Sequence, residues 1–334
     1  MKTILKKSVH IYGFFLALAA CIFFSAQAKA AIVNVGHQKY SYKEYENDLK
    51  EFEGKYPDRC RIKVIGQSAD KRNLYEVVLG NPEADKHLLV IGNLHAREYM
   101  TIQLCMKQIE NYLDNYEGQI SGEKIADVLD KVAIHYIPSC NPDGTAISQF
   151  GFGQIRNARL RKALKKMRGG SRKWKANARG VDLNRNWDIA FRRKGKPGSA
   201  GYHGKKAASE PETKALVKWV NTIQESGKIV GVISYHSTGS ILYGRCAGAA
   251  RATVKSQTKR MMKLAKSMTG YGLMPTESIK AANSCSREYF LYKRHIPCIT
   301  IEVGRGACPL ATREFSSIWK KNKNLVIREA MLFD

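Results

Sequence analysis

The stretch Gly92-Asn93-Leu94-His95-Ala96-Arg97-Glu98-Tyr99-Met100-Thr101 joins a strand-like apolar run, residues 87–91, to a helix-patterned run, residues 102–113. His95 and Glu98 stand three residues apart at this corner. A divalent cation such as zinc takes imidazole nitrogen and carboxylate oxygen at about 2.0–2.2 Å and, in catalytic sites, keeps one position for water. The corner therefore predicts two of the three protein ligands of such a cation, and the third must come from elsewhere in the chain.

Strand-like and helix-like segments alternate along the rest of the chain. Strands are expected over residues 61–65, 73–79, 87–91, 132–137, 229–235 and 298–303, and helices over 40–56, 102–116, 210–225, 255–268 and 313–333. Asn141-Pro142-Asp143-Gly144 predicts a turn. The alternation predicts one α/β domain, residues 31–334, with helices on both faces of a mostly parallel sheet. Ligands of such sheets bind beyond the carboxyl ends of the strands.

Residues 1–30 have the pattern of a secretory signal peptide. Lys2, Lys6 and Lys7 precede an apolar run, residues 11–25, and Ala26-Gln27-Ala28 and Ala28-Lys29-Ala30 then offer small-residue cleavage sites. An alternative cleavage before Cys21 would give a lipoprotein. The apolar run is short for a transmembrane helix, which needs about 20 residues, so no stable membrane span is expected in the mature chain. The protein is therefore expected to be secreted, periplasmic or associated with the cell wall.

The formal net charge of the chain is +27, and because residues 1–30 hold four lysines and no acids, +23 remains on the mature part. Such a surface attracts polyanions. The sequence contains no nucleic-acid-binding motif, so the expected polyanion is anionic cell-wall polymer and not nucleic acid. The basic residues concentrate in a segment that begins with glycines, residues 151–175. It is either a solvated surface insertion or an anchor for an anionic matrix.

Seven cysteines remain after residue 30, and none forms a Cys-x-x-Cys pair, which argues against a structural thiolate zinc site. In an exported protein some of them are expected to pair, and the odd number leaves at least one free thiol. Their connectivity cannot be deduced from the sequence.

Five motifs occur in an order and spacing that resembles the zinc metallocarboxypeptidases. They are His95-x-x-Glu98, Asn141-Pro142-Asp143-Gly144, Gly180-Val181-Asp182-Leu183-Asn184-Arg185-Asn186-Trp187, Ser234-Tyr235-His236-Ser237 and Thr300-Ile301-Glu302. The resemblance spans residues 40–334 and implies a mixed eight-stranded sheet between helices, with one zinc ion per chain. It implies that His95, Glu98 and His236 are the zinc ligands.

The resemblance also implies roles for the neighbouring residues. Glu302 corresponds to the catalytic glutamate, which takes a proton from water and returns it to the leaving amine. Arg97, Asn184 and Arg185 correspond to residues that hold the carboxylate and peptide oxygens of the substrate, a task suited to the planar fork of arginine. A free C-terminal carboxylate is therefore expected at the site.

Two positions depart from the family pattern. Lys175 stands nine residues before Asn184, where many relatives have an oxyanion-stabilising arginine, and Arg172 or Arg179 are alternatives for that role. Lys280 stands 22 residues before Glu302, where the carboxypeptidase A type has a mobile tyrosine.

Arg287 lies fifteen residues before Glu302, at the position that sets the floor of the side-chain pocket. A cation there suits an acidic group, unless Arg287 only pairs with Glu288. With Lys175 and the signal peptide, the 287–290 segment resembles bacterial γ-D-glutamyl-diaminopimelate peptidases. The expected activity is hydrolysis of that bond in muropeptides. The alternatives are a carboxypeptidase for acidic C-termini and a catalytically silent wall-binding protein.

Overall fold

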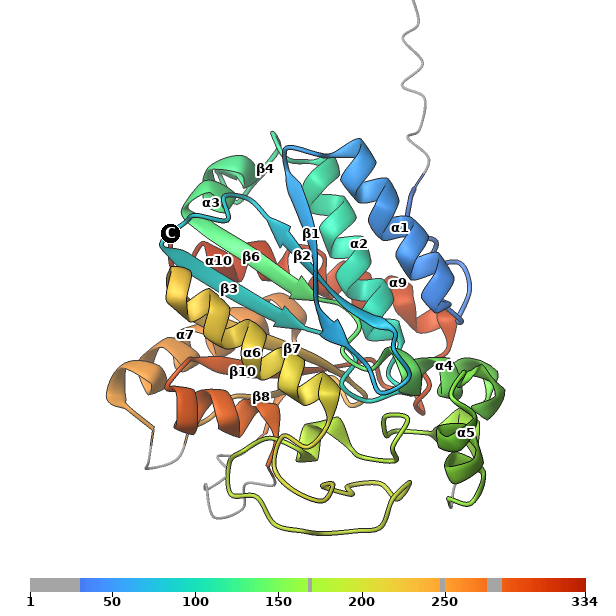
Figure 1. Cartoon of the computed structure of the whole chain (residues 1–334). Helices are drawn as coiled ribbons and strands as arrows, with labels where there is room; N and C mark the ends of the chain where they lie inside the picture. Colours follow the sequence, from blue (N-terminus) through green and yellow to red (C-terminus); the bar gives the residue numbers. More distant parts are fainter. Residues whose placement is uncertain (1–30, 168–169, 247–249, 275–283) are drawn as a thin grey trace, which may run out of the picture. The chain divides into compact units, whose positions relative to one another are not determined.

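The computed structural model describes residues 31–167, 170–246, 250–274 and 284–334, so the predicted signal peptide, Cys21 and Lys280 lie outside the described residues. Residues Ile32–Asp334 form one compact unit built on an eight-stranded sheet in the order β1-β2-β6-β3-β7-β10-β8-β9 (Figure 1). Its strands are β1 (Cys60–Gln67), β2 (Asn73–Leu79), β3 (Lys86–Ile91), β6 (Val132–Ile137), β7 (Lys228–Ser237), β8 (Ile241–Tyr243), β9 (Gly272–Leu273) and β10 (Cys298–Val303). A separate hairpin pairs β4 (Gln119–Ile120) with β5 (Glu123–Lys124).

The sheet is mixed, with a parallel centre, antiparallel pairs on both sides of that centre and a parallel pair, β8–β9, at one edge. The pairs β6–β3, β3–β7 and β7–β10 are parallel. The pairs β1–β2, β2–β6 and β10–β8 are antiparallel. The predicted mixed eight-stranded sheet is therefore confirmed. The central strands read as continuous apolar runs because both of their faces are covered.

Alternate side chains of β3 enter two different cores. Leu88 and Val90 join the larger core, and Leu89 and Ile91 join the other. The larger core also contains buried residues of α1 (Tyr42–Lys55), α2 (Met100–Asp114), α3 (Ile125–Lys131), α7 (Ala252–Thr269), α9 (Phe315–Asn322) and α10 (Leu325–Ala330). The second core contains residues of α6 (Pro211–Ser226) and of the π-helix Tyr289–Arg294, which follows α8 (Ser286–Glu288). Helices thus cover both faces of the sheet, as predicted.

The prediction of one closing helix over residues 313–333 is wrong. This part of the chain consists of a short 3-10 turn, Thr312–Glu314, followed by α9 and α10, which are separated by a turn at residues 323–324. The buried side chain of Asn322 donates to Tyr271 Oη at 3.2 Å and to the carbonyl of Ile318 at 2.8 Å. Side-chain bonds of this kind compete with the helical backbone pattern, which accounts for the break.

Asn141-Pro142-Asp143-Gly144 was predicted as a turn, but it begins a helix, α4 (Pro142–Phe150). The Asn141 side chain caps this helix by accepting from the amide of Gly144 at 3.0 Å, and Pro142 occupies the first helical position.

The basic segment 151–175 is anchored on one side and exposed on the other. Ile155, Leu164 and Trp174 are buried in a small cluster of their own. The carboxylate of Asp70 accepts from the amides of Arg156 and Asn157, each at 2.8 Å. Arg159, Lys162 and Lys165 of α5 (Ala158–Lys165) are exposed, so the segment is a packed element with a basic outer face.

All seven cysteines of the described part are free thiols, so the expected pairing of some of them is absent there. Among the described residues, no helix combines the length and the apolar character needed to cross a bilayer.

Candidate active site

The corner after β3 is held in an unusual backbone path. A side chain at Gly92 would place its Cβ 2.6 Å from the carbonyl oxygen of Pro138, so only glycine fits there. Asn93 adopts a left-handed conformation with φ of 56°. Its amide donates to Thr101 Oγ1 at 3.1 Å, and its side chain accepts from Thr145 Oγ1 at 2.6 Å. These bonds fix the loop that presents His95 and Glu98.

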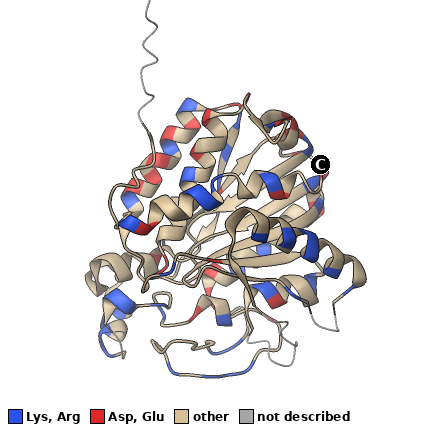
Figure 2. Ribbon diagram, turned by 180° about the vertical axis from the view of Figure 1, so that it is seen from behind, with Lys and Arg blue, Asp and Glu red and all other residues tan. Residues whose placement is uncertain are grey.

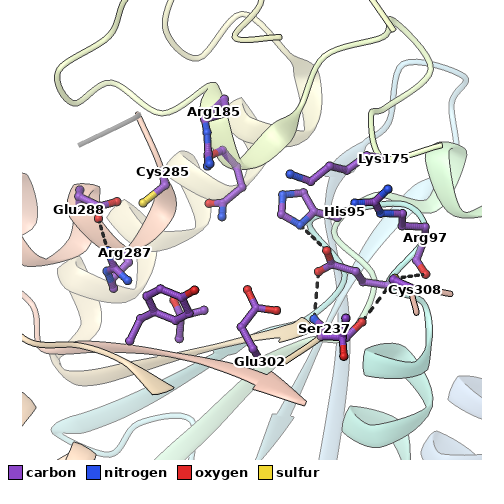
Figure 3. A pocket seen from close by; sticks show the side chains of 15 residues that line it. His95, Arg97, Lys175, Arg185, Ser237, Cys285, Arg287, Glu288, Glu302 and Cys308 are labelled. Carbon is purple, nitrogen blue, oxygen red and sulfur yellow. Dashed lines mark hydrogen bonds and ion pairs between the residues drawn. The ribbon is translucent and has the colours of Figure 1, made fainter. Parts of the chain in front are cut away.

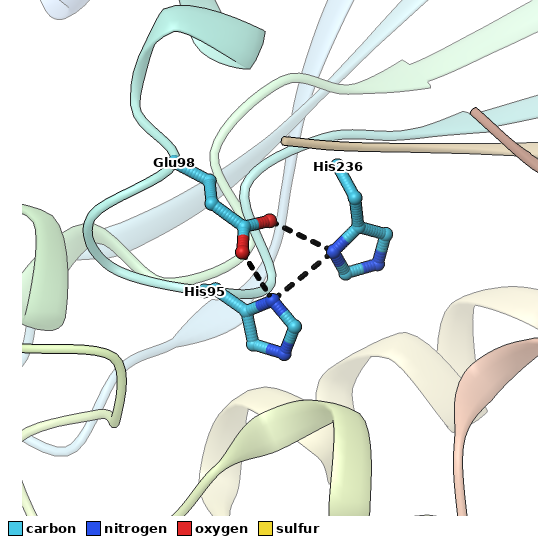
Figure 4. Close-up of side chains that lie close together, drawn as sticks. All are labelled: His95, Glu98 and His236. Carbon is cyan, nitrogen blue, oxygen red and sulfur yellow. Dashed lines mark hydrogen bonds and ion pairs between the residues drawn. The ribbon is translucent and has the colours of Figure 1, made fainter. Parts of the chain in front are cut away.

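His95, Glu98 and His236 meet at the ends of β3 and β7, as Figure 4 shows. His95 Nδ1 lies 2.8 Å from Glu98 Oε1, and His236 Nδ1 lies 2.9 Å from Glu98 Oε2 and 3.1 Å from His95 Nδ1. All three side chains are buried. Two imidazole nitrogens and one carboxylate converging on one point are the donor set of a catalytic zinc site. The three residues predicted as zinc ligands are therefore brought together in a geometry that fits the ion.

The surroundings of Glu98 keep it in its charged form. Burial acts to raise the pKa of Glu98, but the His95 and His236 rings outweigh it and hold that pKa well below its ordinary value. The Ser237 amide adds a hydrogen bond to Glu98 Oε2 at 3.2 Å. Glu98 is therefore a carboxylate, which is the form that binds metal.

Asp182 is a member of the site that the sequence motifs did not single out. It is fully buried, and its Oδ1 lies 3.2 Å from His95 Nε2 while its Oδ2 lies 3.0 Å from Lys175 Nζ. A carboxylate at Nε2 keeps the proton on that nitrogen and leaves Nδ1 free for metal. Asp182 lies two residues before Asn184 inside one of the five motifs, and this position was the signal in the sequence that could have identified it as a site residue.

His95 and Glu98 line a cavity of about 440 Å³ that also brings together the other predicted site residues (Figure 3). Arg97, Lys175, Asn184, Arg185, Arg287 and Glu302 all line it. Arg172 and Arg179, the alternatives to Lys175, are both exposed and are not among the lining residues. Of these three candidates, Lys175 alone lines the cavity.

Glu302 lies on β10 in register with His236 on the neighbouring strand β7. Its carboxylate points into the cavity beside the triad (Figure 3). Burial raises the pKa of Glu302 to about 7; the His236 ring opposes this rise, and the nearby Glu98 carboxylate adds to it. A carboxyl group with such a pKa suits proton transfer in both directions near neutrality.

Asn184 is oriented by a residue that sequence reasoning missed. The amide and the hydroxyl of Ser286 both donate to Asn184 Oδ1, at 2.9 and 3.0 Å. This leaves the Asn184 amino group facing His236 Nε2 at 3.5 Å. Arg185 donates to the Asn184 carbonyl at 2.7 Å. Within the described part of the chain, the buried Nε of Arg97 has no hydrogen-bond partner.

Arg287 and Glu288 form an ion pair on the opposite side of the cavity from Lys175 and Arg97 (Figure 3). Arg287 Nη2 lies 2.5 Å from Glu288 Oε1, and the guanidinium stands over the ring of Tyr243 at 5.2 Å. The pairing that the sequence left as an alternative is thus present. Both residues line the cavity.

Known proteins resemble this chain in sequence and in structure. The gamma-D-glutamyl-L-diamino acid endopeptidase 1 of Lysinibacillus sphaericus is 27% identical over 298 residues, which cover 86% of this chain and 71% of that protein. The solved structure of carboxypeptidase A from Helicoverpa armigera has a TM-score of 0.67 at 17% identity and covers 92% of this chain and 78% of its own. Bovine thrombin-activatable fibrinolysis inhibitor has a TM-score of 0.65 at 18% identity, covering 88% of this chain and 97% of its own.

At these identities the solved structures show a shared fold. The family profile described as "Zinc carboxypeptidase" matches residues 45–325, most of the chain and the whole range in which the site residues lie. The chain therefore belongs to the zinc carboxypeptidase family and is a zinc metallopeptidase.

Proposed function

We propose that the protein hydrolyses the γ-D-glutamyl–diaminopimelate bond of cell-wall muropeptides. The observation that carries the proposal is the Arg287–Glu288 pair on the cavity wall across from Lys175. The far end of diaminopimelate carries one carboxylate and one ammonium group. Arg287 is suited to the first and Glu288 to the second, so the pair complements a zwitterion. The endopeptidase from L. sphaericus, whose name specifies a γ-D-glutamyl-L-diamino acid bond, supports the same substrate class.

The residues of the site divide the work of hydrolysis. Zinc bound by His95, Glu98 and His236 would polarise the scissile carbonyl and lower the pKa of a water molecule. Glu302 accepts the proton of the attacking water and returns it to the departing amine. Lys175 provides positive charge for the oxygen that becomes negative in the transition state.

The remaining residues either orient the catalytic side chains or bind the substrate. Asp182 orients both Lys175 and His95 through the contacts at 3.0 and 3.2 Å. The cations Arg97 and Arg185, together with the amino group of Asn184, surround the part of the cavity next to the triad. They are suited to bind the free α-carboxylate of the leaving amino acid.

We further propose that the enzyme is exported and that the outer face of α5 binds anionic cell-wall polymer. The support is the net charge and the exposed cations of a helix whose other side is packed. Replacing Arg159, Lys162 and Lys165 by Gln should weaken wall binding at low salt and leave hydrolysis of small substrates intact. The matched control neutralises Lys43, Lys50 and Arg61, which are exposed on other elements. Equal binding by the two triple variants would contradict the α5 proposal.

The activity is tested by mass spectrometry of the products that the purified enzyme forms from muropeptides. The expected products are a fragment ending in D-glutamate and a fragment beginning with diaminopimelate. A chelator should stop their formation and zinc should restore it. Cleavage of simple peptides with acidic C-termini in preference to muropeptides would favour the carboxypeptidase alternative. No cleavage of either substrate by zinc-loaded protein would favour the silent wall-binding alternative.

A further inference from the structure

A second cavity, of about 500 Å³, lies between α7 and the edge strands β8 and β9. Its floor is apolar, with Met262 buried in the larger core and Leu273 packed against that core. Tyr243 lines the active-site cavity, and the next residue, Gly244, lines this second one, so the two cavities flank the end of β8. The size is in the usual range of about 300–1,000 Å³ for ligand sites.

Cations surround this apolar floor. They are Arg245, Lys255, Lys259, Lys263 and Lys266. The four lysines recur at intervals of four, four and three residues along α7, which places them on one face of the helix. Helix α7 contains no acidic residue, and Figure 2 shows Lys and Arg along it.

This arrangement is unfavourable for the isolated protein. Lysines spaced i,i+4 on a helix repel each other. A carboxylate paired with a lysine would offset that repulsion. In the described part of the chain, no carboxylate pairs with Lys259, Lys263 or Lys266. An anionic ligand would relieve it. A hydrophilic polyanion would relieve it as well, but it would leave the apolar floor beside Met262 and Leu273 without a partner.

We propose that the α7 groove, defined by these lining residues, binds an anionic membrane lipid, with the head group at the lysines and part of an acyl chain on the apolar floor. The protein then docks on an anionic bilayer through α7. Because the active-site cavity adjoins the groove through β8, docking holds the active site beside the membrane surface.

The test is co-sedimentation of the compact unit, residues 32–334, which lacks the apolar N-terminal run, with phosphatidylcholine vesicles that contain phosphatidylglycerol. Each lysine near an anionic surface contributes roughly fivefold to partitioning, so K259Q/K263Q should bind about thirtyfold more weakly. The control K43Q/K50Q makes the same charge change on exposed positions of α1 and should bind nearly as well as the parent. Equal losses for the two double variants would overturn the proposal, because binding would then follow net charge alone.

A second variant tests the apolar floor. Leu273→Ser should weaken binding to the anionic vesicles several-fold and leave binding to inorganic polyphosphate unchanged. If Leu273→Ser leaves vesicle binding unchanged while K259Q/K263Q weakens polyphosphate and vesicle binding alike, the groove is a general polyanion site and the lipid proposal fails. Melting temperature and hydrolysis of a small soluble substrate report folding of each variant. A raised KM of K259Q/K263Q for that substrate without vesicles would also overturn the proposal, since the groove would then belong to the substrate path.

Discussion

Replacing Asp182 by Asn tests whether the buried carboxylate organises the metal site. Asp182 is fully buried and makes contacts at 3.2 Å with His95 Nε2, 3.0 Å with Lys175 Nζ and 3.0 Å with the Asn184 amide. Asn preserves the shape but removes the charge that polarises the imidazole and holds the lysine. Loss of such an outer partner typically lowers metal affinity or activity by about 10–100-fold, equivalent to roughly 1.4–2.7 kcal/mol.

The assay is competition for zinc between the enzyme and a chelating dye. Asp182→Asn should raise the zinc dissociation constant by about 10–100-fold. At saturating zinc its kcat/KM should remain below that of the parent, because Lys175 is no longer held. Asp188→Asn is the matched control, because Asp188 is exposed and pairs only with Lys293 among the described residues. Zinc affinity of Asp182→Asn within twofold of the parent, with the melting temperature of the metal-free protein unchanged, would refute this reasoning.

Two further predictions concern the ligand set and a buried acid. His236→Ala should lose most of the bound zinc in elemental analysis, whereas Glu302→Gln should keep zinc and lose activity; equal zinc loss would make Glu302 a ligand. Burial raises the pKa of Glu212 from 4.5 to about 8, so the native protein retains a proton that the unfolded chain releases. Stability should therefore fall as pH rises from about 5 to 8, and Glu212→Gln should flatten this fall in thermal melts; an unchanged slope would contradict it.

The parts of the fold that follow from local patterns were predictable from the sequence. The apolar run of β3 and the helical period of α2 located the corner that carries His95 and Glu98. The resemblance to a known family then supplied His236 and Glu302, which the sheet brings into register on β7 and β10. The resemblance also implied the mixed eight-stranded sheet, but the order of its strands was not predicted, because pairing depends on contacts that no local pattern encodes.

Other features depend on the directions of side chains that are distant in sequence. Asn322, which lies at the break between α9 and α10, donates to Tyr271, 51 residues away. The anchoring of the basic segment depends on Asp70, 86 residues before Arg156. The role of Asp182 depends on the position of His95 Nε2, 87 residues away in the chain. None of these pairings leaves a periodic or compositional signal, so the sequence alone could not predict them.

The claim that Arg287 recognises the distal carboxylate of diaminopimelate decides the substrate class. Arg287→Met leaves Glu288 in place and removes a charge-assisted contact worth about 1.5–3 kcal/mol, or roughly ten- to more than a hundredfold in selectivity. The measurement is kcat/KM of the parent and Arg287→Met on two substrates, one with diaminopimelate and one with lysine, which lacks the distal carboxylate. The predicted result is a loss of that size on the diaminopimelate substrate and little change on the lysine substrate. Equal losses on both substrates would contradict the claim and leave Arg287 as a structural partner of Glu288.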